Sequence, residues 1–275
     1  MKMINLKTCK MMAMAAFAMG VLTVTGSCMN SVGAGNAVVN GNLTYNQADL
    51  TVKPFTKIEV ETVADVYYVQ NNTDKQEVRF DFSKIKNADL QKQYKEKVKA
   101  VYRDGKLVIG LSGKITGASN LKAGERLEAY VSSPDLVKVT LEGVGSFHTD
   151  AINSDVFEID NEGVGSVYVK DLLANKVSID NEGVGNVTID KLQADNLDID
   201  NEGVGNVNIG KFKGGRMKID NEGVGKVQAD VDCQSINATL EGVGNIRLSG
   251  VTRHFTRTKE GVGSFKVSDL KVLEQ

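Results

Sequence analysis

The heptapeptide Ile-Asp-Asn-Glu-Gly-Val-Gly occupies residues 159–165 and returns at 179–185, 199–205 and 219–225. Its last four residues occur seven times, and successive copies begin 20, 20, 20, 20, 19 and 19 residues apart. Seven copies at a nearly constant spacing predict a repeat protein in which each copy stacks on the next. The seven glutamates are Glu142, Glu162, Glu182, Glu202, Glu222, Glu241 and Glu260.

Apolar and polar residues alternate on both sides of each copy. All seven residues that lie five positions after the glutamate are apolar, namely Phe147, Val167, Val187, Val207, Val227, Ile246 and Phe265. A period of two is typical of strands with one buried face, and the glycines in mid-repeat disfavour helices. We therefore predict an all-β fold, a parallel β-solenoid with rungs of about 20 residues, wound as a right-handed single-stranded β-helix.

The position before each glutamate indicates which side chains point inward. Leucine stands there in the first and sixth copies, as Leu141 and Leu240, so the four asparagines between them are also expected to face the core. Stacked one rung apart, they would form an amide ladder whose members satisfy one another. Lys259 holds this position in the last copy, which predicts an atypical final rung. The predicted ladder is Asn161, Asn181, Asn201 and Asn221.

Glycines of the repeat are predicted to form the corner between two short strands, where their conformational freedom suits a turn. A polar return such as residues 171–175 would complete each rung. The predicted turn glycines are Gly163, Gly165, Gly183, Gly185, Gly203, Gly205, Gly223 and Gly225.

Outward-facing carboxylates one rung apart form an acidic stripe, and each neighbouring pair in water costs about 1 kcal/mol. Glycine amides at the corner could offset this repulsion, with counter-charge from Lys170, Lys191, Lys211 and Lys226. The alternative is a row of Ca²⁺ sites, although the repeat lacks the aspartate-bearing nonapeptide of calcium-loaded β-rolls. No other cofactor is expected. The candidate metal ligands are Asp160, Glu162, Asp180, Glu182, Asp200, Glu202, Asp220 and Glu222.

The first 28 residues have the features of a secretory targeting signal. Three lysines precede an apolar run over residues 11–24, and Thr25-Gly26-Ser27 stand just before Cys28. This order predicts a lipoprotein-type signal peptide over residues 1–27 and lipidation of Cys28, with ordinary cleavage or an uncleaved anchor as alternatives. Residues 28–50 would hold a tether and a first strand. The expected location is the bacterial cell envelope, on the surface or the periplasmic face of the outer membrane, through a lipid anchor.

Residues 51–139 lack the tetrapeptide but retain strand-like runs, and residues 140–275 form the predicted seven-rung solenoid. Asp104-Gly105 is a two-residue hairpin signal, and residues 87–94 predict a short helix capped by Asn87. The section before the repeat is expected to form irregular opening turns of the same solenoid, or a small sheet that covers its end.

Composition excludes several functional classes. A formal net charge of -2 with 25% charged residues excludes a basic nucleic-acid binder. The two histidines, His148 and His254, fall about five rungs apart on the predicted stack, and no Ser/His/Asp arrangement or Cys/His metal spacing stands out.

Cys233 is expected to be a small buried hydrophobe. Tyr168, at an outward position, is the candidate aromatic platform for a glycan, with Tyr67 and Tyr68 also considered.

Further stretches carry a family resemblance: residues 55–60 as an opening strand, residues 104–109, and Pro134-Asp135-Leu136 leading into glycine-punctuated repeats. Together with the signal, they resemble the GIN domain, described as a putative auto-transporter adhesin head domain, over residues 54–267. The resemblance implies an all-β, solenoid-like fold on an envelope-associated protein, and it offers no catalytic residues. The corner departs from the family, which more often has Ser-Gly-Ala-Gly.

Taken together, these features predict a lipid-anchored β-solenoid that presents a rigid surface to an unknown protein or glycan partner, in adhesion or envelope-associated binding. One alternative is a periplasm-facing structural or ligand-binding lipoprotein. Another is a carbohydrate-active β-helix enzyme, but Asp180, Glu182 and Lys191 belong to the repeat, and near-identical copies in successive rungs favour a structural role. We therefore expect that the protein is not an enzyme.

Overall fold

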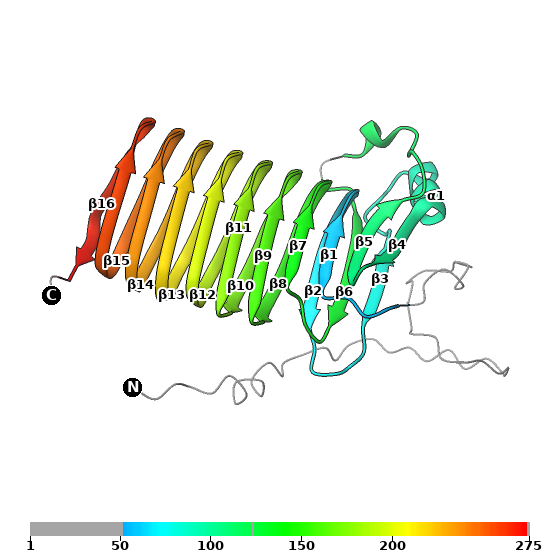
Figure 1. Cartoon of the computed structure of the whole chain (residues 1–275). Coiled ribbons are helices and arrows are strands. Elements are labelled where there is room, and N and C mark those ends of the chain that lie inside the picture. Colours follow the sequence, from blue (N-terminus) through cyan, green and yellow to red (C-terminus); the bar gives the residue numbers. More distant parts are fainter. Residues whose placement is uncertain (1–51, 123, 274–275) are drawn as a thin grey trace.

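The computed structural model describes residues 52–122 and 124–273, and these form a parallel β-solenoid of about seven turns with rungs of about 20 residues. Strands account for 69% of these described residues and helices for 6%, which confirms the all-β prediction. The predicted signal peptide of residues 1–27, Cys28, and the tether and first strand of residues 28–50 lie outside the described residues. Figure 1 shows the strands stacked along one axis, in sequence order over the repeat.

Each repeat pairs in parallel with the next at the repeat register, so that identical positions stack: Val167 lies beside Val187, and Asn181 beside Asn201. In the first rungs the polar return separates two strands, as predicted. From β12 onward one strand runs through the return without a break. The strands of the repeat are β7 (Lys138–Leu141), β8 (Val144–Asn153), β9 (Val156–Asn161), β10 (Val164–Leu173), β11 (Lys176–Asn181), β12 (Val184–Asn201), β13 (Val204–Asn221), β14 (Val224–Leu240), β15 (Val243–Lys259) and β16 (Val262–Val272).

The opening turns do not stack in sequence order. β1 (Lys57–Val60) lies between β5 (Lys106–Leu111) and β7, and β2 (Val63–Gln70) lies between β6 (Leu127–Ser133) and β8, all in parallel. The chain thus builds one turn, leaves it to form an outer turn, and returns to the first turn to begin the repeat. The register places Val63 beside Val144 and Ala64 beside Gly145, so residues 61–64 form a further corner.

A small cap covers the end of the solenoid beyond the outer turn (Figure 1). β3 (Glu77–Asp81) pairs antiparallel with β6, and β4 (Val98–Arg103) pairs antiparallel with β5. The predicted hairpin is present, with positive φ angles of 49° at Asp104 and 73° at Gly105. The predicted helix is also present as α1 (Ala88–Lys97), and the Asn87 side chain accepts a hydrogen bond of 3.0 Å from the Leu90 amide. The section before the repeat therefore combines both predicted arrangements, opening turns and an end cover.

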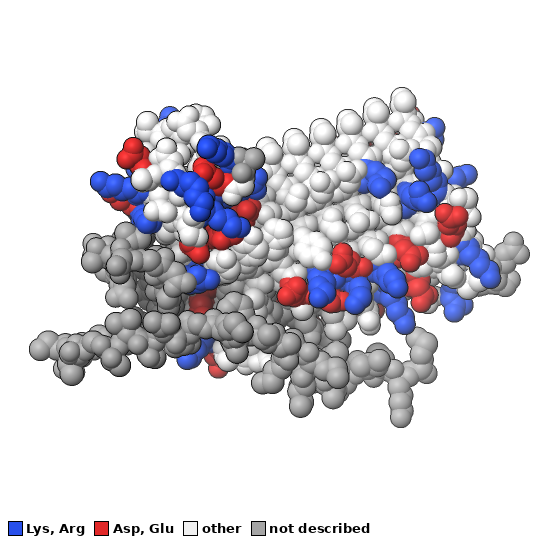
Figure 2. All heavy atoms as spheres, turned by 180° about the vertical axis from the view of Figure 1, so that it is seen from behind, with Lys and Arg blue, Asp and Glu red and all other residues white. Residues whose placement is uncertain are grey.

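The opposite end of the solenoid is protected by charge. β16 pairs only with β15 among the described strands, and Phe265 and Leu270 are only partly buried there. Lys259, at the otherwise inward position, is exposed because no described rung follows it. Lysine and arginine side chains on an edge discourage pairing with another chain. They gather at this end of the molecule in Figure 2, and the exposed ones include Arg253, Arg257, Lys259, Lys266 and Lys271.

The core is a continuous apolar column inside the stacked turns. Phe147, Val167, Val187 and Val207 lie above one another with at most 1% of their surface exposed. None of the helices in the part of the chain that the structure describes is long and apolar enough to cross a membrane.

Candidate functional site

The four asparagines before the corner form a buried ladder along the axis. Each Nδ2 donates to the Oδ1 of the next asparagine, over 2.6 Å from Asn161 to Asn181 and 2.7 Å for the two later bonds. All four side chains are fully buried. Only the outermost atoms, Asn161 Oδ1 and Asn221 Nδ2, lack a partner. The ladder holds the corner above it in the same register from rung to rung.

The corner glycines lie where the sequence predicts them, but for a different reason. None of them has a positive φ. In the described chain, the glycines with a positive φ are Gly105, Gly117, Gly124 and Gly250. Instead, a Cβ at Gly183 or Gly185 would press against the carbonyl oxygen of the glycine one rung before it, far inside van der Waals contact. The repeat therefore needs glycine for the close approach of neighbouring rungs, and the turn-geometry explanation was wrong.

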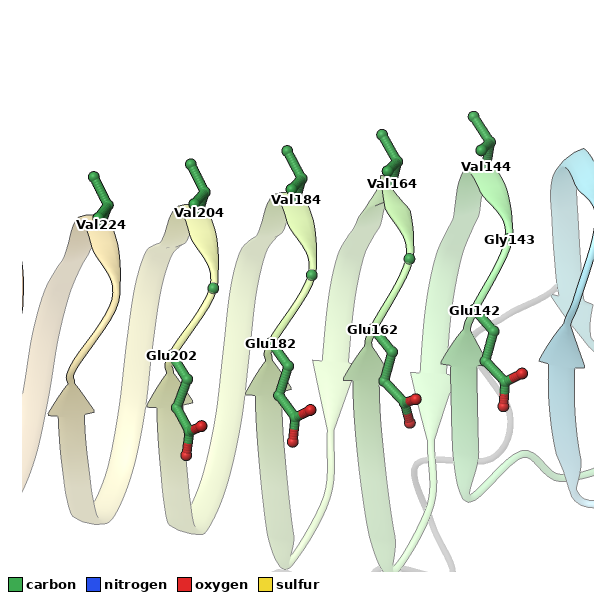
Figure 3. Close-up of a pocket in the computed structure, with 13 residues that line it drawn as sticks. Glu142, Gly143, Val144, Glu162, Val164, Glu182, Val184, Glu202, Val204 and Val224 are labelled. Carbon is green, nitrogen blue, oxygen red and sulfur yellow. The ribbon is translucent and has the colours of Figure 1, made fainter.

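A shallow groove of about 590 Å³ runs along this corner across five rungs. Glycines form its floor, a row of valines stands on one side and a row of glutamates on the other, as Figure 3 shows. The valine side chains are exposed to 40–53% although they are apolar. The valines are Val144, Val164, Val184, Val204 and Val224, and the glutamates are Glu142, Glu162, Glu182 and Glu202.

The corner glutamates are not neutralised in the way the sequence suggests. The glycine amides donate to carbonyl oxygens of the preceding rung, for example Gly163 N to Leu141 O at 2.7 Å. Lys191 pairs with Asp171 at 3.3 Å, and Lys226 donates to the Gln228 side chain at 2.7 Å. Among the described residues, none of the four lysines proposed as counter-charges forms an ion pair with a corner glutamate. The expectation of internal compensation was therefore wrong, and the carboxylate row faces solvent unpaired.

A second acidic row runs parallel to the groove, one residue before the asparagines. Its end members are paired, Asp160 with Lys138 and Asp220 with Lys218, each at 2.5 Å. Asp180 forms no such pair within the described chain. Partial burial, followed by repulsion from Glu182, Asp200 and Asp160, raises the pKa of Asp180 to about 6. Partial burial, followed by repulsion from Glu202, Asp220 and Glu222, likewise raises the pKa of Asp200.

We expect Asp180→Asn to raise the melting temperature at pH 7.5 by about 2 °C, after allowing for solvent screening of this half-exposed group. A carboxyl whose folded pKa lies above its unfolded value destabilises the fold when it ionises, so stability falls as pH rises from about 4 to 6. Asparagine removes that loss, and at pH 4 the variant should match the parent. Thermal melts at both pH values test this. Asp160→Asn, which removes a carboxylate paired with Lys138, should give no gain.

In the described part of the chain, no three carboxylates of the repeat lie close enough together to hold a cation among themselves. Within the described residues, only Glu59, Glu61 and Glu142 bring three carboxylate oxygens within 4.8 Å of one another. Glu59 is already paired with Lys106. Sequence reasoning missed this cluster because Glu59 and Glu61 lie outside the repeat and join it only through the out-of-order opening turn. Calcium binding by the acidic rows stays a prediction.

Tyr168 ends a row of rings on the outer surface of the sheet opposite the ladder strands. Tyr130 and Tyr67 stack at 5.3 Å between centroids, Tyr67 and His148 at 5.2 Å, and His148 and Tyr168 approach at 6.3 Å. The Arg79 guanidinium covers the far side of Tyr130 at 4.0 Å. Tyr130, Tyr67 and His148 therefore cover one another's faces, which a sugar would need for stacking. Tyr168 is instead tilted by 50° to His148 and donates a hydrogen bond to Asp190 at 2.6 Å. Of the other tyrosines considered, Tyr68 is buried and hydrogen-bonded to Ser133.

The structure brings together a serine, a histidine and an aspartate that the sequence did not connect, because strand β2 inserts beside β8. Ser146 Oγ lies 2.7 Å from His148 Nε2 and donates to Asp65 Oδ1 at 2.7 Å. Since a hydroxyl has one proton, Nε2 must itself be the donor to Ser146 and is not free to act as its base. Burial also lowers the pKa of His148. His254 lies far away on β15, so this arrangement does not activate a nucleophile.

A known protein family matches most of the chain. Residues 54–230 and 210–274 match the family described as "Putative auto-transporter adhesin, head GIN domain". The chain belongs to this family. The comparison with curated proteins finds no match.

Solved structures agree with the GIN-domain assignment. A putative adhesin from Bacteroides fragilis is 26% identical, with a TM-score of 0.68 over 78% of this chain and 93% of its own. A putative lipid binding protein from Parabacteroides distasonis is 17% identical, with a TM-score of 0.56 over 78% of this chain and 94% of its own, and at that identity it shows the fold alone. The GIN family and the Bacteroides fragilis neighbour support an adhesin-like binding protein of the bacterial surface or envelope, and neither is described as an enzyme.

Proposed function

We propose that this protein is a lipid-anchored, outer-membrane adhesin-like protein that holds a rigid, rod-like binding surface away from the membrane. The observation that carries the proposal is the corner groove, in which the same valine and glutamate recur rung after rung at the surface. Monomeric proteins seldom leave a contiguous apolar row in water unless it meets a partner. Near-identical rungs also suit extended recognition better than a single tuned reaction centre.

The anchor rests on the sequence before the described region. Lipidation of Cys28 would tie the chain to the membrane, and residues 29–51 would separate the solenoid from it. The alternative, a periplasm-facing lipoprotein with a structural or ligand-binding role, differs in the side of the membrane on which the solenoid stands. A carbohydrate-active enzyme would need Asp180, Glu182 and Lys191 to act together, and it is disfavoured because Lys191 pairs with Asp171 instead.

Protease shaving tests the proposed topology. Intact cells that produce the full chain are treated with protease and blotted for the repeat region, with lysed cells and a periplasmic marker as controls. We expect the repeat signal to be lost from intact cells while the marker is spared, and Cys28→Ser to release the protein from the membrane fraction. Protection in intact cells combined with cleavage after lysis would rule out a surface adhesin and favour the periplasmic alternative.

A further inference from the structure

The geometry points to the occupant of the corner groove: we propose that it binds a basic amphipathic α-helix of a partner protein. The apolar side of the helix would pack on the valine row, and its lysine or arginine side chains would face the glutamate row. This inference deepens the proposed function by naming the site and the partner class, and it rests on that function for its biological setting.

The valine row supplies the apolar half of the site. Val164, Val184, Val204 and Val224 are each exposed to 51–53%, and the row continues beyond the groove through Val243 at 55% and Val262 at 75%. Neighbouring valines pair directly in the parallel register, so the methyl groups lie about 4.8 Å apart along the axis. Five rungs therefore present a straight apolar strip about 19 Å long.

The glutamate row supplies the charged half and argues against self-association through this face. Glu162, Glu182 and Glu202 are exposed and form no ion pair or hydrogen bond with their side chains within the described residues. If a second copy faced the groove with its axis reversed, glutamates would meet glutamates. If the axes ran in the same direction, each valine row would meet a glutamate row. A partner with positive charge avoids both outcomes.

The backbone of the corner favours a helix over an added strand. The corner amides of Gly183 and Val184 already donate to Asn161 O at 2.7 Å and Gly163 O at 2.9 Å. The floor therefore offers no free amide row with which an extended chain could pair, whereas a helix satisfies its own backbone. Side chains three or four apart on a helix are about 5–6 Å apart, close to the rung spacing. A strand repeats on one face every 6.6–6.8 Å or so and would lose register within two rungs.

The test measures binding of a defined peptide to the full chain by fluorescence anisotropy at 50 mM salt. The probe is a labelled 18-residue Leu/Lys peptide with its leucines on one helical face. We expect saturable binding that weakens about tenfold with Glu162→Gln, Glu182→Gln and Glu202→Gln combined, since three surface ion pairs are lost. The combination of Val164→Thr, Val184→Thr and Val204→Thr keeps β-branched side chains on the strands and should weaken binding severalfold through lost apolar contact.

Matched controls make the outcome decisive. Asp150→Asn, Asp195→Asn and Asp232→Asn together remove the same charge from exposed positions outside the groove and should leave binding within twofold. A Leu/Glu peptide with the same pattern should not bind, and a Ser/Lys peptide should bind at least tenfold more weakly. The inference would be overturned if the triple aspartate control weakened binding as much as the triple glutamate variant does. It would also be overturned if neither the triple glutamate variant nor the triple valine variant changed the affinity.

Failure of this inference and failure of the proposed function give different results. If the solenoid is shaved from intact cells but the Leu/Lys peptide ignores the groove variants, the surface location stands and the helix-binding site is wrong. If the solenoid is protected in intact cells and the peptide still responds to the groove variants, the site stands and its partner lies in the periplasm.

Discussion

Gly185→Ala should lower the melting temperature by about 6–12 °C or prevent folding, a loss of about 3 kcal/mol or more. The added Cβ would press on the Gly165 carbonyl oxygen, and this oxygen lies in a backbone already hydrogen-bonded to its neighbours. At this corner the Cβ would point along the axis at the backbone of the preceding rung, and backbone moves less readily than a side chain. Thermal and urea unfolding of the purified variant measure the loss.

Gly113→Ala is the matched control for this substitution. Gly113 is exposed, has no positive φ, and nothing lies within 4 Å of the position its Cβ would take. Alanine there should leave stability unchanged or raise it slightly, because it reduces the freedom of the unfolded chain. A Gly185→Ala protein as stable as the Gly113→Ala protein would contradict the account of the corner, and glycine there would need another explanation.

The repeat region was predictable because its signals are periodic. Exchange of leucine for asparagine before the corner indicates an inward position, and the structure buries both residue types there. Strand alternation likewise predicts a buried Val167 and an exposed Glu162. Parallel stacking places each residue beside its own copy one rung away, so the same contact recurs in every rung. Each copy of the repeat therefore gives independent support to the same inference.

The opening turns were not predictable, because their contacts are long-range and not repeated. β1 joins β7 across about 80 residues, and nothing local in residues 57–60 indicates that a later strand will pair with them. Thr62 and Ala64 stand where the repeat has glycine, which conceals the corner at Glu61 from a search for the tetrapeptide. The Asp65–Ser146 hydrogen bond depends on the pairing of β2 with β8, and the Glu59 cluster depends on the pairing of β1 with β7.

The groove falls between these two cases. The alternation predicts that the glutamates face outward, but the partners of a charged side chain depend on geometry that the repeat does not encode. The corner amides are committed to carbonyl oxygens of the preceding rung, and the lysines lie elsewhere on the surface. The valine between the two glycines is apolar, and its apolar character alone does not indicate that the corner exposes it.

Asn201→Leu should cost about 3 kcal/mol and lower the melting temperature by roughly 6–12 °C. The substitution removes both hydrogen bonds of an interior member of the ladder. It leaves the Asn181 amide nitrogen and the Asn221 carbonyl oxygen buried without partners, at about 1–3 kcal/mol each, which the added apolar burial only partly offsets. Denaturant unfolding monitored by circular dichroism measures the difference.

Asn161→Leu makes the same chemical change at the end of the ladder and should cost less than half as much. It removes one hydrogen bond and leaves one side-chain oxygen of Asn181 buried without a partner. It also eliminates the Asn161 oxygen that already lacks a partner. Leu141, directly beside it in the register, shows that leucine fits this position. Replacing all four asparagines with leucine removes every stranded group and should recover most of the stability lost in Asn201→Leu. Equal losses of stability at Asn161 and Asn201, or a quadruple variant less stable than either single variant, would contradict this account. Side-chain volume, and not hydrogen bonding, would then determine the stability of the ladder.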